Sequence, residues 1–440
     1  MLEETASWVH SPIARAAVIG VLILLLMIPL AMVGMLVGER EATRFVVERE
    51  VAEKWGGDQL LVGPILSVPY RYRTFGPNGE VLSHVGHTRF LPAILDIEGD
   101  VRPEIRYRGI YEVALYDVGL RWTGEFERPD PGIWKIPAED VLWDEAVLVV
   151  GIPDLRGIKR AVVARWGDEA LTFEPGPGAV ALCASGIHAR ILHLEEAAPG
   201  ERVPFSFELD LNGSRELLFS PLGKETRLSL TSTWPSPSFT GQFLPDSREV
   251  RPNGFTAEWN ISYLTRPFPQ EWKDNEVTAD LLAQWTSGVS LFQPVDSYTK
   301  TSRTTKYGIL FLFMTFAVYF LFESLGRLRI HPFQYLLVGF ALCLFYLLLL
   351  SLSEHVGFGK AYLVASAGTV GLIAAYSGSV LGSLGRAAAI GAGLSGLYAY
   401  LYVLLQLEDY ALVLGSLGLF ALLAAAMALT RRVDWYAAGR

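Results

Sequence analysis

Apolar residues form long, uninterrupted runs in two parts of the chain. The first run covers residues 16–37 and contains no charged side chain. Five further apolar runs follow near the carboxy terminus, at about 307–323, 333–353, 361–382, 387–407 and 410–429. Because about 20 apolar residues in a helix cross the hydrocarbon of a bilayer, the pattern predicts six membrane-spanning helices.

The region between the first two runs has other periodicities. Residues 39–56 place Phe45, Val46 and Trp55 at roughly helical spacing, which predicts a stalk helix that ends at Gly56. From Gln59 to about Tyr298 short stretches alternate between apolar and polar residues, as in "RVPFSFELDLN". This alternation is typical of half-buried β-strands, and frequent proline and glycine separate the stretches.

Together these patterns predict a multi-pass α-helical membrane protein with a large antiparallel β-rich extracytoplasmic domain, arranged in two sandwich-like layers. The expected domains are an amino-terminal transmembrane anchor at 1–38, a stalk helix at 39–56, the periplasmic β-rich domain at 57–304, a bundle of five transmembrane helices at 305–430 and a cytoplasmic tail at 431–440.

Composition narrows the class of protein. The hydrophobic share of 51% over 440 residues is high for a soluble protein. The net charge of -9 argues against a nucleic-acid partner, since no basic stripe is present to neutralise phosphates. The two cysteines, Cys183 and Cys343, lie in regions of opposite character and predict no disulfide framework.

Charged residues between Tyr307 and Thr430 all fall at expected helix ends or in short connections. We therefore expect no ionisable side chain on the buried faces of the spans, which argues against an ion-coupled transporter. Five arginines are expected to share one side of the membrane with the amino terminus: Arg327, Arg329 and Arg386 in the short connections, and Arg431 and Arg432 after the last run. By the positive-inside rule this side is cytoplasmic, so residues 40–304 are periplasmic.

Glu354 and His355 end the third expected span and admit two interpretations. In one they mark the outer membrane boundary and dock the β domain onto the spans. In the other they form a proton-relay or metal pair. Adjacent residues on a helix point about 100° apart, so the two side chains do not readily hold one ion, and the docking interpretation is favoured.

The remaining chemistry-bearing patterns predict no catalytic, cofactor or metal site. Cys183, His188 and His193 lack the close-spaced pair and convergence of a zinc site, and no Gly-x-Ser-x-Gly nucleophile motif is present. The stretch 231–250 carries Trp234, Phe239 and Phe243 among prolines and glycines. It either packs on the sheets or presents a binding surface, and core packing is favoured.

Several segments resemble the CreD family of cell envelope integrity inner-membrane proteins. They are "LVGP" at 61–64, "PDLRGI" at 153–158, "WPSPSFTGQFLP" at 234–245, "HPFQYLL" with "SEH" in the third span, and "TRRVDWYA" at 430–437. The resemblance implies one amino-terminal span, a periplasmic domain and further carboxy-terminal spans. It also implies a role in envelope integrity, bacteriocin tolerance and the response to cell-wall antibiotics, with no established reaction or cofactor.

The motif positions that match the family are the candidate interaction residues His331, Gln334, Tyr335, Glu354, His355, Asp434 and Trp435. The leading hypothesis is a non-catalytic protein of the bacterial inner membrane that contacts membrane lipids or an envelope protein partner. The alternative is a membrane enzyme or transporter for an envelope lipid or glycan, with a site near Glu354 and His355. A sensor of envelope stress is the third hypothesis. The sequence does not indicate an oligomeric state.

The topology is testable by cysteine labelling in intact cells, with both native cysteines replaced. A membrane-impermeant reagent should reach a cysteine at Asn212 and leave one at Ser383 unlabelled, because the first is expected outside and the second inside. Labelling at Ser383 without labelling at Asn212 would contradict the predicted orientation.

Overall fold

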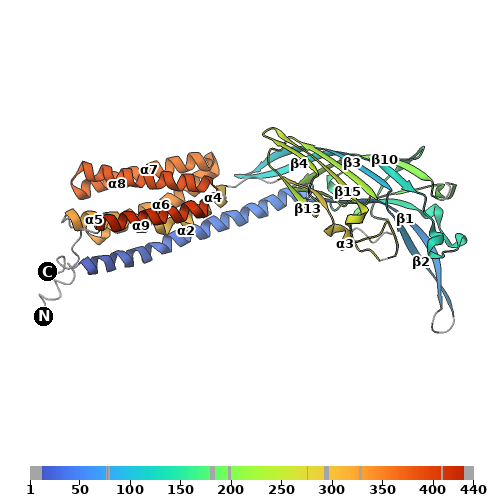
Figure 1. Ribbon diagram of the computed structural model, residues 1–440, viewed down its shortest axis with the longest axis horizontal. Coiled ribbons are helices and arrows are strands. Elements are labelled where there is room, and N and C mark those ends of the chain that lie inside the picture. Colours follow the sequence, from blue (N-terminus) through green and yellow to red (C-terminus); the bar gives the residue numbers. More distant parts are fainter. Residues whose placement is uncertain are drawn as a thin grey trace. The chain divides into compact units, whose positions relative to one another are not determined.

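The computed structural model describes residues 12–75, 77, 80–178, 184–196, 200–274, 276–291, 297–326, 330–407 and 410–430. The chain divides into two compact units. One, which we call the membrane unit, consists of Met1–Phe45 and Val295–Arg440; the other, the β unit, is Val46–Pro294. Figure 1 shows the helices of the first and the strands of the second.

The membrane unit is helical. Its helices are α2 (Pro12–Trp55, which continues into the β unit), α4 (Ser297–Lys306), α5 (Gly308–Gly326), α6 (Pro332–Val356), α7 (Phe358–Leu381), α8 (Leu384–Gln406) and α9 (Ala411–Thr430). By length and composition α2, α6, α7 and α8 are able to cross a membrane, and the apolar part of α5, Gly308–Phe320, is shorter. The prediction of a multi-pass helical membrane protein is confirmed.

The expected anchor and stalk form one uninterrupted helix. α2 continues through Pro29 and ends at Trp55. Gly56 follows with a positive φ of 150°, a conformation that other residues rarely adopt. The chain therefore leaves the helix at the residue where the sequence predicts its end.

The described residues of the β unit form two sheets. The nine-stranded sheet has the order β13 (Pro237–Gly241), β17 (Ser287–Leu291), β11 (Glu216–Phe219), β1 (Gln59–Phe75), β5 (Val147–Gly151), β9 (Gly186–Arg190), β8 (Glu174–Pro175), with β2 (Val81–Phe90) paired to β1 and β16 (Glu271–Lys273) paired to β2. The eight-stranded sheet has the order β14 (Ser247–Arg251), β15 (Gly254–Ser262), β12 (Glu225–Ser232), β3 (Ile94–Arg108), β4 (Tyr111–Glu127), β10 (Arg202–Ser214), β6 (Val163–Trp166), β7 (Glu169–Thr172).

Short helices lie in the connections of the β unit. They are η1 (Pro131–Trp134), η2 (Ala138–Asp140), η3 (Trp143–Glu145), η4 (Leu155–Gly157), η5 (Leu194–Glu196), η6 (Tyr263–Thr265) and α3 (Ala279–Gln284).

Both sheets are mixed, although most of their strand pairs are antiparallel. β1 runs parallel to β11, and β3 runs parallel to β12. The expectation of a β-rich domain is confirmed, and its antiparallel character is corrected at these two pairs. Alternation reports which face of a strand is buried and carries no information on the direction of its neighbour.

The core of the β unit lies between the two sheets. Trp122 on β4 stacks on Phe207 of β10 at 5.5 Å between ring centroids, and it contacts Phe219 of the other sheet at 6.0 Å. Phe207, Leu209 and Leu211 are buried, while Glu208 is exposed between them. The alternating pattern therefore places one face of β10 in the core and leaves the other to solvent.

The last turns of α2 belong to the β unit and bind the β3–β4 hairpin. The guanidinium of Arg106 lies 3.7 Å from the ring centroid of Trp55, and the indole N–H of Trp55 donates to the carbonyl of Tyr116 at 3.3 Å. Arg108 pairs with Glu50 at 2.7 Å. These contacts hold the last turns of α2, from Val46 on, against the strands of the β unit.

Residues 46–294 should fold without the rest of the chain, because both sheets bury their apolar faces within this unit. The expressed fragment should give a β-dominated circular dichroism spectrum and one cooperative thermal transition. Trp55→Ala should lower its stability by about 1–3 kcal/mol, the range of a cation–π contact and a hydrogen bond together. A helix-dominated spectrum, or no loss on Trp55→Ala, would contradict this account.

Candidate functional site

The segment "HPFQY" forms the start of α6. His331 is the residue before the helix, and its Nδ1 accepts a hydrogen bond from the backbone of Phe333 at 3.2 Å. The side chain of Gln334 accepts one from the backbone N–H of His331 at 3.0 Å. With Pro332 in the first turn, these residues make a capping box, which satisfies two otherwise unpaired backbone donors. His331 and Gln334 therefore begin the helix.

Tyr335, one residue further on, binds a buried carboxylate. Its hydroxyl donates to Glu323 on α5 at 2.8 Å. Arg15 of α2 pairs with the other oxygen of Glu323 at 3.1 Å, and the Glu323 side chain is only 4% exposed. We call Arg15, Glu323 and Tyr335 the inner cluster. The carboxylate of Glu323 on α5 thus binds a residue of α2 and a residue of α6.

The inner cluster corrects one expectation. Glu323 lies three residues before the end of α5, where the sequence suggests a solvated helix end, yet the structure buries it. The prediction that the buried faces of the spans carry no ionisable group is therefore wrong at this position. The charge is compensated by Arg15, as a carboxylate away from water requires.

The middle of α6 packs against α2 by close approach. α2 buries Leu26, Leu30, Val33 and Val37 along one stripe. A Cβ at Gly339 of α6 would overlap the Leu26 side chain. One turn further along α6, the Cys343 thiol lies 3.7 Å from the Leu26 carbonyl. The glycine in "LLVGF" is therefore required for this contact.

Glu354 forms a second cluster at the other end of α6. The hydroxyl of Tyr298 on α4 donates to Glu354 at 3.1 Å, and Arg40 of α2 lies 3.9 Å from the same oxygen. We call these three residues the outer cluster. The Glu354 side chain is 10% exposed, whereas His355 is exposed. The two residues do not converge, in keeping with their spacing on a helix, and docking of the β domain by them stays a prediction.

The two clusters lie a membrane's thickness apart along α2. Arg15 and Arg40 are 25 residues apart in one helix, a rise of about 37 Å. The hydrocarbon core of a bilayer is about 30 Å thick. Each arginine therefore suits one interfacial layer, where a charged side chain reaches water and costs little.

The other candidate residues have separate positions. Trp234 belongs to the core of the β unit, and Phe239 and Phe243 pack against that core. Phe239 meets the rings of Phe255 and Trp259 at 5.7 and 5.9 Å, and Phe243 meets Trp285 at 5.9 Å. Asp434, Trp435 and Cys183 lie outside the described residues. Among the described residues no group of three His, Cys, Asp or Glu side chains is placed to hold a metal ion.

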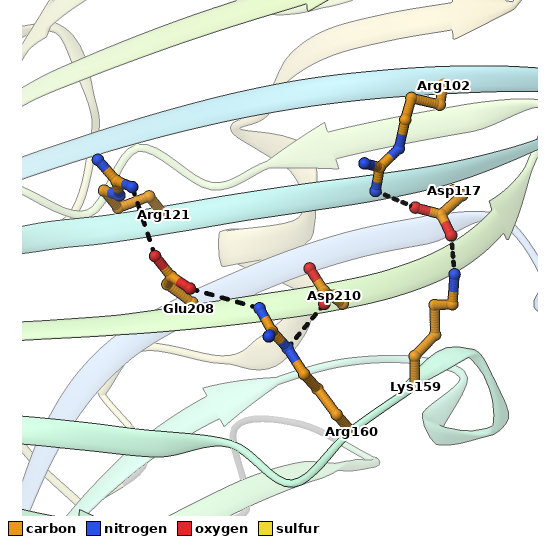
Figure 2. A network of polar contacts seen from close by, with 7 residues as sticks. All are labelled: Arg102, Asp117, Arg121, Lys159, Arg160, Glu208 and Asp210. Atoms are coloured by element: carbon orange, nitrogen blue, oxygen red, sulfur yellow. Dashed lines mark hydrogen bonds and ion pairs between the residues drawn. The ribbon is translucent and has the colours of Figure 1, made fainter.

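A further group of charged residues lies on the solvent face of the eight-stranded sheet (Figure 2). Arg121 of β4 donates to Glu208 of β10 at 3.4 Å. Arg160, from the connection before β6, donates to Glu208 at 3.3 Å and pairs with Asp210 at 2.7 Å. Beside them Asp117 accepts from both Arg102 and Lys159. We call these seven residues the sheet-face network.

The sheet-face network changes the pKa of Asp117. Partial burial alone would raise the pKa of this carboxyl. Hydrogen bonds from Lys159 and Arg102 to the ionised form outweigh burial and lower the pKa below its ordinary value. Lys159 and Arg102 therefore favour the charged form of Asp117.

Sequence motifs mark some residues of these sites and leave others unmarked. The motif positions His331, Tyr335 and Glu354 all make cluster or capping contacts. Arg15 and Arg40 flank the first span and give no pairing signal of their own. The sheet-face network was missed because its partners come from different strands and a connection, and only β10 shows the alternating acids in sequence.

The comparisons with known proteins agree over nearly the whole chain. The family described as "Inner membrane protein CreD" matches residues 11–436. The chain is 33% identical over 422 residues to the inner membrane protein CreD of Escherichia coli (strain K12). That similarity covers 94% of this chain and 92% of the relative.

Removing a carboxylate from either cluster should loosen α2 from the bundle. Glu323→Ala or Glu354→Ala removes the carboxylate that an arginine and a tyrosine hydroxyl bind in each cluster, a loss of about 1–3 kcal/mol. Cys343 is buried against α2, so a thiol-reactive dye should label it faster and at lower temperature in each variant carrying Cys183→Ser. His355→Ala is the matched control, because its side chain is exposed. Unchanged labelling in Glu323→Ala would contradict the assigned role of the cluster.

The sheet-face network should make the stability of the β unit depend on acid. Because the folded pKa of Asp117 is lowered, its contribution is complete above the unfolded pKa of about 4 and is lost as the pH falls through the folded value. Asp117→Asn should cost about 0.5–1 kcal/mol at pH 7, and the difference from wild type should shrink on acidification. Thermal melts of the fragment 46–294 across this range measure it; a difference that grows in acid would contradict the pairing.

Proposed function

Since the chain belongs to the CreD family of inner membrane proteins, we propose that it supports cell envelope integrity and tolerance of envelope stress without a catalytic reaction of its own. On this proposal the β unit makes protein or lipid contacts on the periplasmic side. The helices of the membrane unit anchor it.

The sheet-face network is the observation that carries the proposal. Three arginines, one lysine and three carboxylates pair with one another on the solvent face of a sheet whose other face is core. Charged groups held by mutual contacts lose less freedom when a partner binds than free ones do. An ordered polar surface of both signs is therefore suited to a specific contact.

The proposed topology has both termini in the cytoplasm and residues 40–304 in the periplasm. The orientation is supported by the arginines of the short connections, which lie on one side in this arrangement. A membrane span between the inner and outer clusters is supported by their separation of about the thickness of a bilayer. The β unit then lies where envelope components are within reach.

The contacts of Glu354 and His355 support the non-catalytic proposal over an enzyme or transporter at this position. Glu354 already binds Tyr298 and Arg40, and His355 is exposed on another side of the helix. A general acid and base would both have to reach one reacting group. Here one residue of the pair is engaged in holding helices together.

The proposal is testable by charge reversal on the sheet face in cells that lack the native gene. Arg160→Glu should abolish protection against envelope stress, because it places a third carboxylate beside Glu208 and Asp210. Arg251→Glu is the matched control: Arg251 lies on edge strand β14 of the same sheet, is similarly exposed and also forms a carboxylate pair, with Glu249. Protein abundance is measured by immunoblot in every strain.

Two results would count against the proposal. Full protection by Arg160→Glu at normal abundance would mean that the sheet face makes no essential contact. Loss of protection by Glu354→Gln, with Cys343 labelling unchanged, would favour an enzyme or transporter with its site in the outer cluster.

A further inference from the structure

The sheet-face network surrounds a hollow. Two adjoining open hollows of about 450 and 470 Å³ share Arg121, Arg160 and Glu208 in their walls. The first has Gly119 in its floor, with Asp100 and Asp210 at its sides. Side chains of both charge signs therefore face one concave surface.

Gly119 lacks the steric reason that explains the other strand glycines of this sheet. A Cβ at Gly99 would press on the buried Leu230, and one at Gly124 or Gly213 would overlap a carbonyl or a tyrosine ring. Gly254 has a positive φ of 142°. A Cβ at Gly119 would meet the Asp210 carboxylate at 3.5 Å and the Arg102 guanidinium at 3.8 Å, both ordinary contacts with exposed or half-buried side chains.

A glycine in the middle of a strand weakens the sheet by roughly 0.5–1 kcal/mol relative to alanine. Where neither backbone conformation nor packing requires it, the remaining reason for a bare backbone is the close approach of another molecule. Gly119 therefore points to a ligand that lies on the floor of the hollow.

The strand register places opposite charges around that floor. Asp100 on β3 and Asp210 on β10 are the direct partners of Gly119 on its two sides. In the next row Glu98, Arg121 and Glu208 lie side by side. Asp100 is 63% exposed and lies 3.9 Å from Arg102. Among the described residues Glu98 has no ion-pair partner.

We propose that this hollow binds a short peptide that carries both a free ammonium group and a free carboxylate. The ammonium lies over Gly119 between Asp100 and Asp210, and the carboxylate binds the guanidinium of Arg121, beside Arg160. Charge-assisted hydrogen bonds of this kind are shorter and stronger than neutral ones. Of the described residues that line the hollow around Gly119 none is aromatic, so they provide no stacking platform for a sugar ring.

This inference rests on the proposed function and names the chemistry of one contact. Peptides of this charge have two sources in the envelope: the stem peptides of the cell wall, and the peptides or chain termini of proteins. The shared feature is the pair of opposite charges, and the experiment separates the sources.

Binding is measured by calorimetry on the full chain in detergent with three probes. They are the wall stem tripeptide alanyl-γ-D-glutamyl-diaminopimelate, trialanine, and N-acetyl-trialanine amide, which lacks both charges. A charged probe should bind, the blocked probe should not, and binding should weaken as salt increases. Tighter binding of the stem tripeptide would identify the wall as the source, and tighter binding of trialanine a protein source.

Gly119→Val separates binding from folding. Valine favours strands, so the variant should melt at no lower temperature than wild type, while its side chain fills the floor. Affinity should fall at least about tenfold, the loss expected when one charge-assisted hydrogen bond is prevented. Thr256→Val is the matched control: Thr256 is exposed on β15 of the same sheet and lies outside the hollow.

Three outcomes overturn the inference. They are no binding of either charged probe to wild type, unchanged affinity in Gly119→Val, and equal losses in Gly119→Val and Thr256→Val. The proposed function fails separately. If no probe binds but Arg160→Glu still abolishes protection in cells, the ligand chemistry is wrong and the sheet-face contact stands.

Discussion

Helices inside a bilayer gain little from the hydrophobic effect when they associate, because lipid tails are as apolar as their own side chains. α2 therefore depends on close packing and on charge. Gly339 lets Leu26 approach α6, while Arg15 and Arg40 bind carboxylates on α5 and α6 at opposite ends of the span. A single face of α6, from its capping box to Glu354, organises most of these contacts. Helix contacts thus account for Tyr335, Gly339 and Glu354 in the motifs "HPFQYLLVGF" and "SEH", and helix capping accounts for His331 and Gln334.

The β unit follows the opposite physical rule. Water surrounds it, so burial of Trp122, Phe207 and their neighbours between two sheets drives its folding. The same alternation leaves Glu208 and Asp210 on the solvent face, where cross-strand partners hold them. Burial between the sheets explains the apolar residues of the core face. On the solvent face the charged side chains are paired with one another, which solubility alone does not require. This pairing is the basis of the proposed function.

The local pattern of apolar and polar residues was sufficient to predict apolar membrane helices, the end of α2 near Gly56 and the buried residues of β10. It was insufficient wherever the answer depends on a partner distant in sequence. The local sequence around Glu323 is typical of a solvated helix end. Its burial and its ion pair depend on Arg15, about 300 residues earlier. The parallel pairing of β3 with β12 has no local signature. Likewise the sequence shows a glycine at 119, while its lack of a steric reason becomes visible only beside Asp210 and its other neighbours.

The edge strand β14 has a consequence for how other molecules approach the sheet. All five of its residues are exposed, and Arg248, Glu249 and Arg251 occupy three of the positions. Charge on an exposed edge discourages pairing with a strand from another chain, the route by which β proteins aggregate. At high protein concentration this edge resists polymerisation of the domain. A molecule that binds this sheet would then meet its solvent face, where recognition depends on side chains instead of backbone hydrogen bonds.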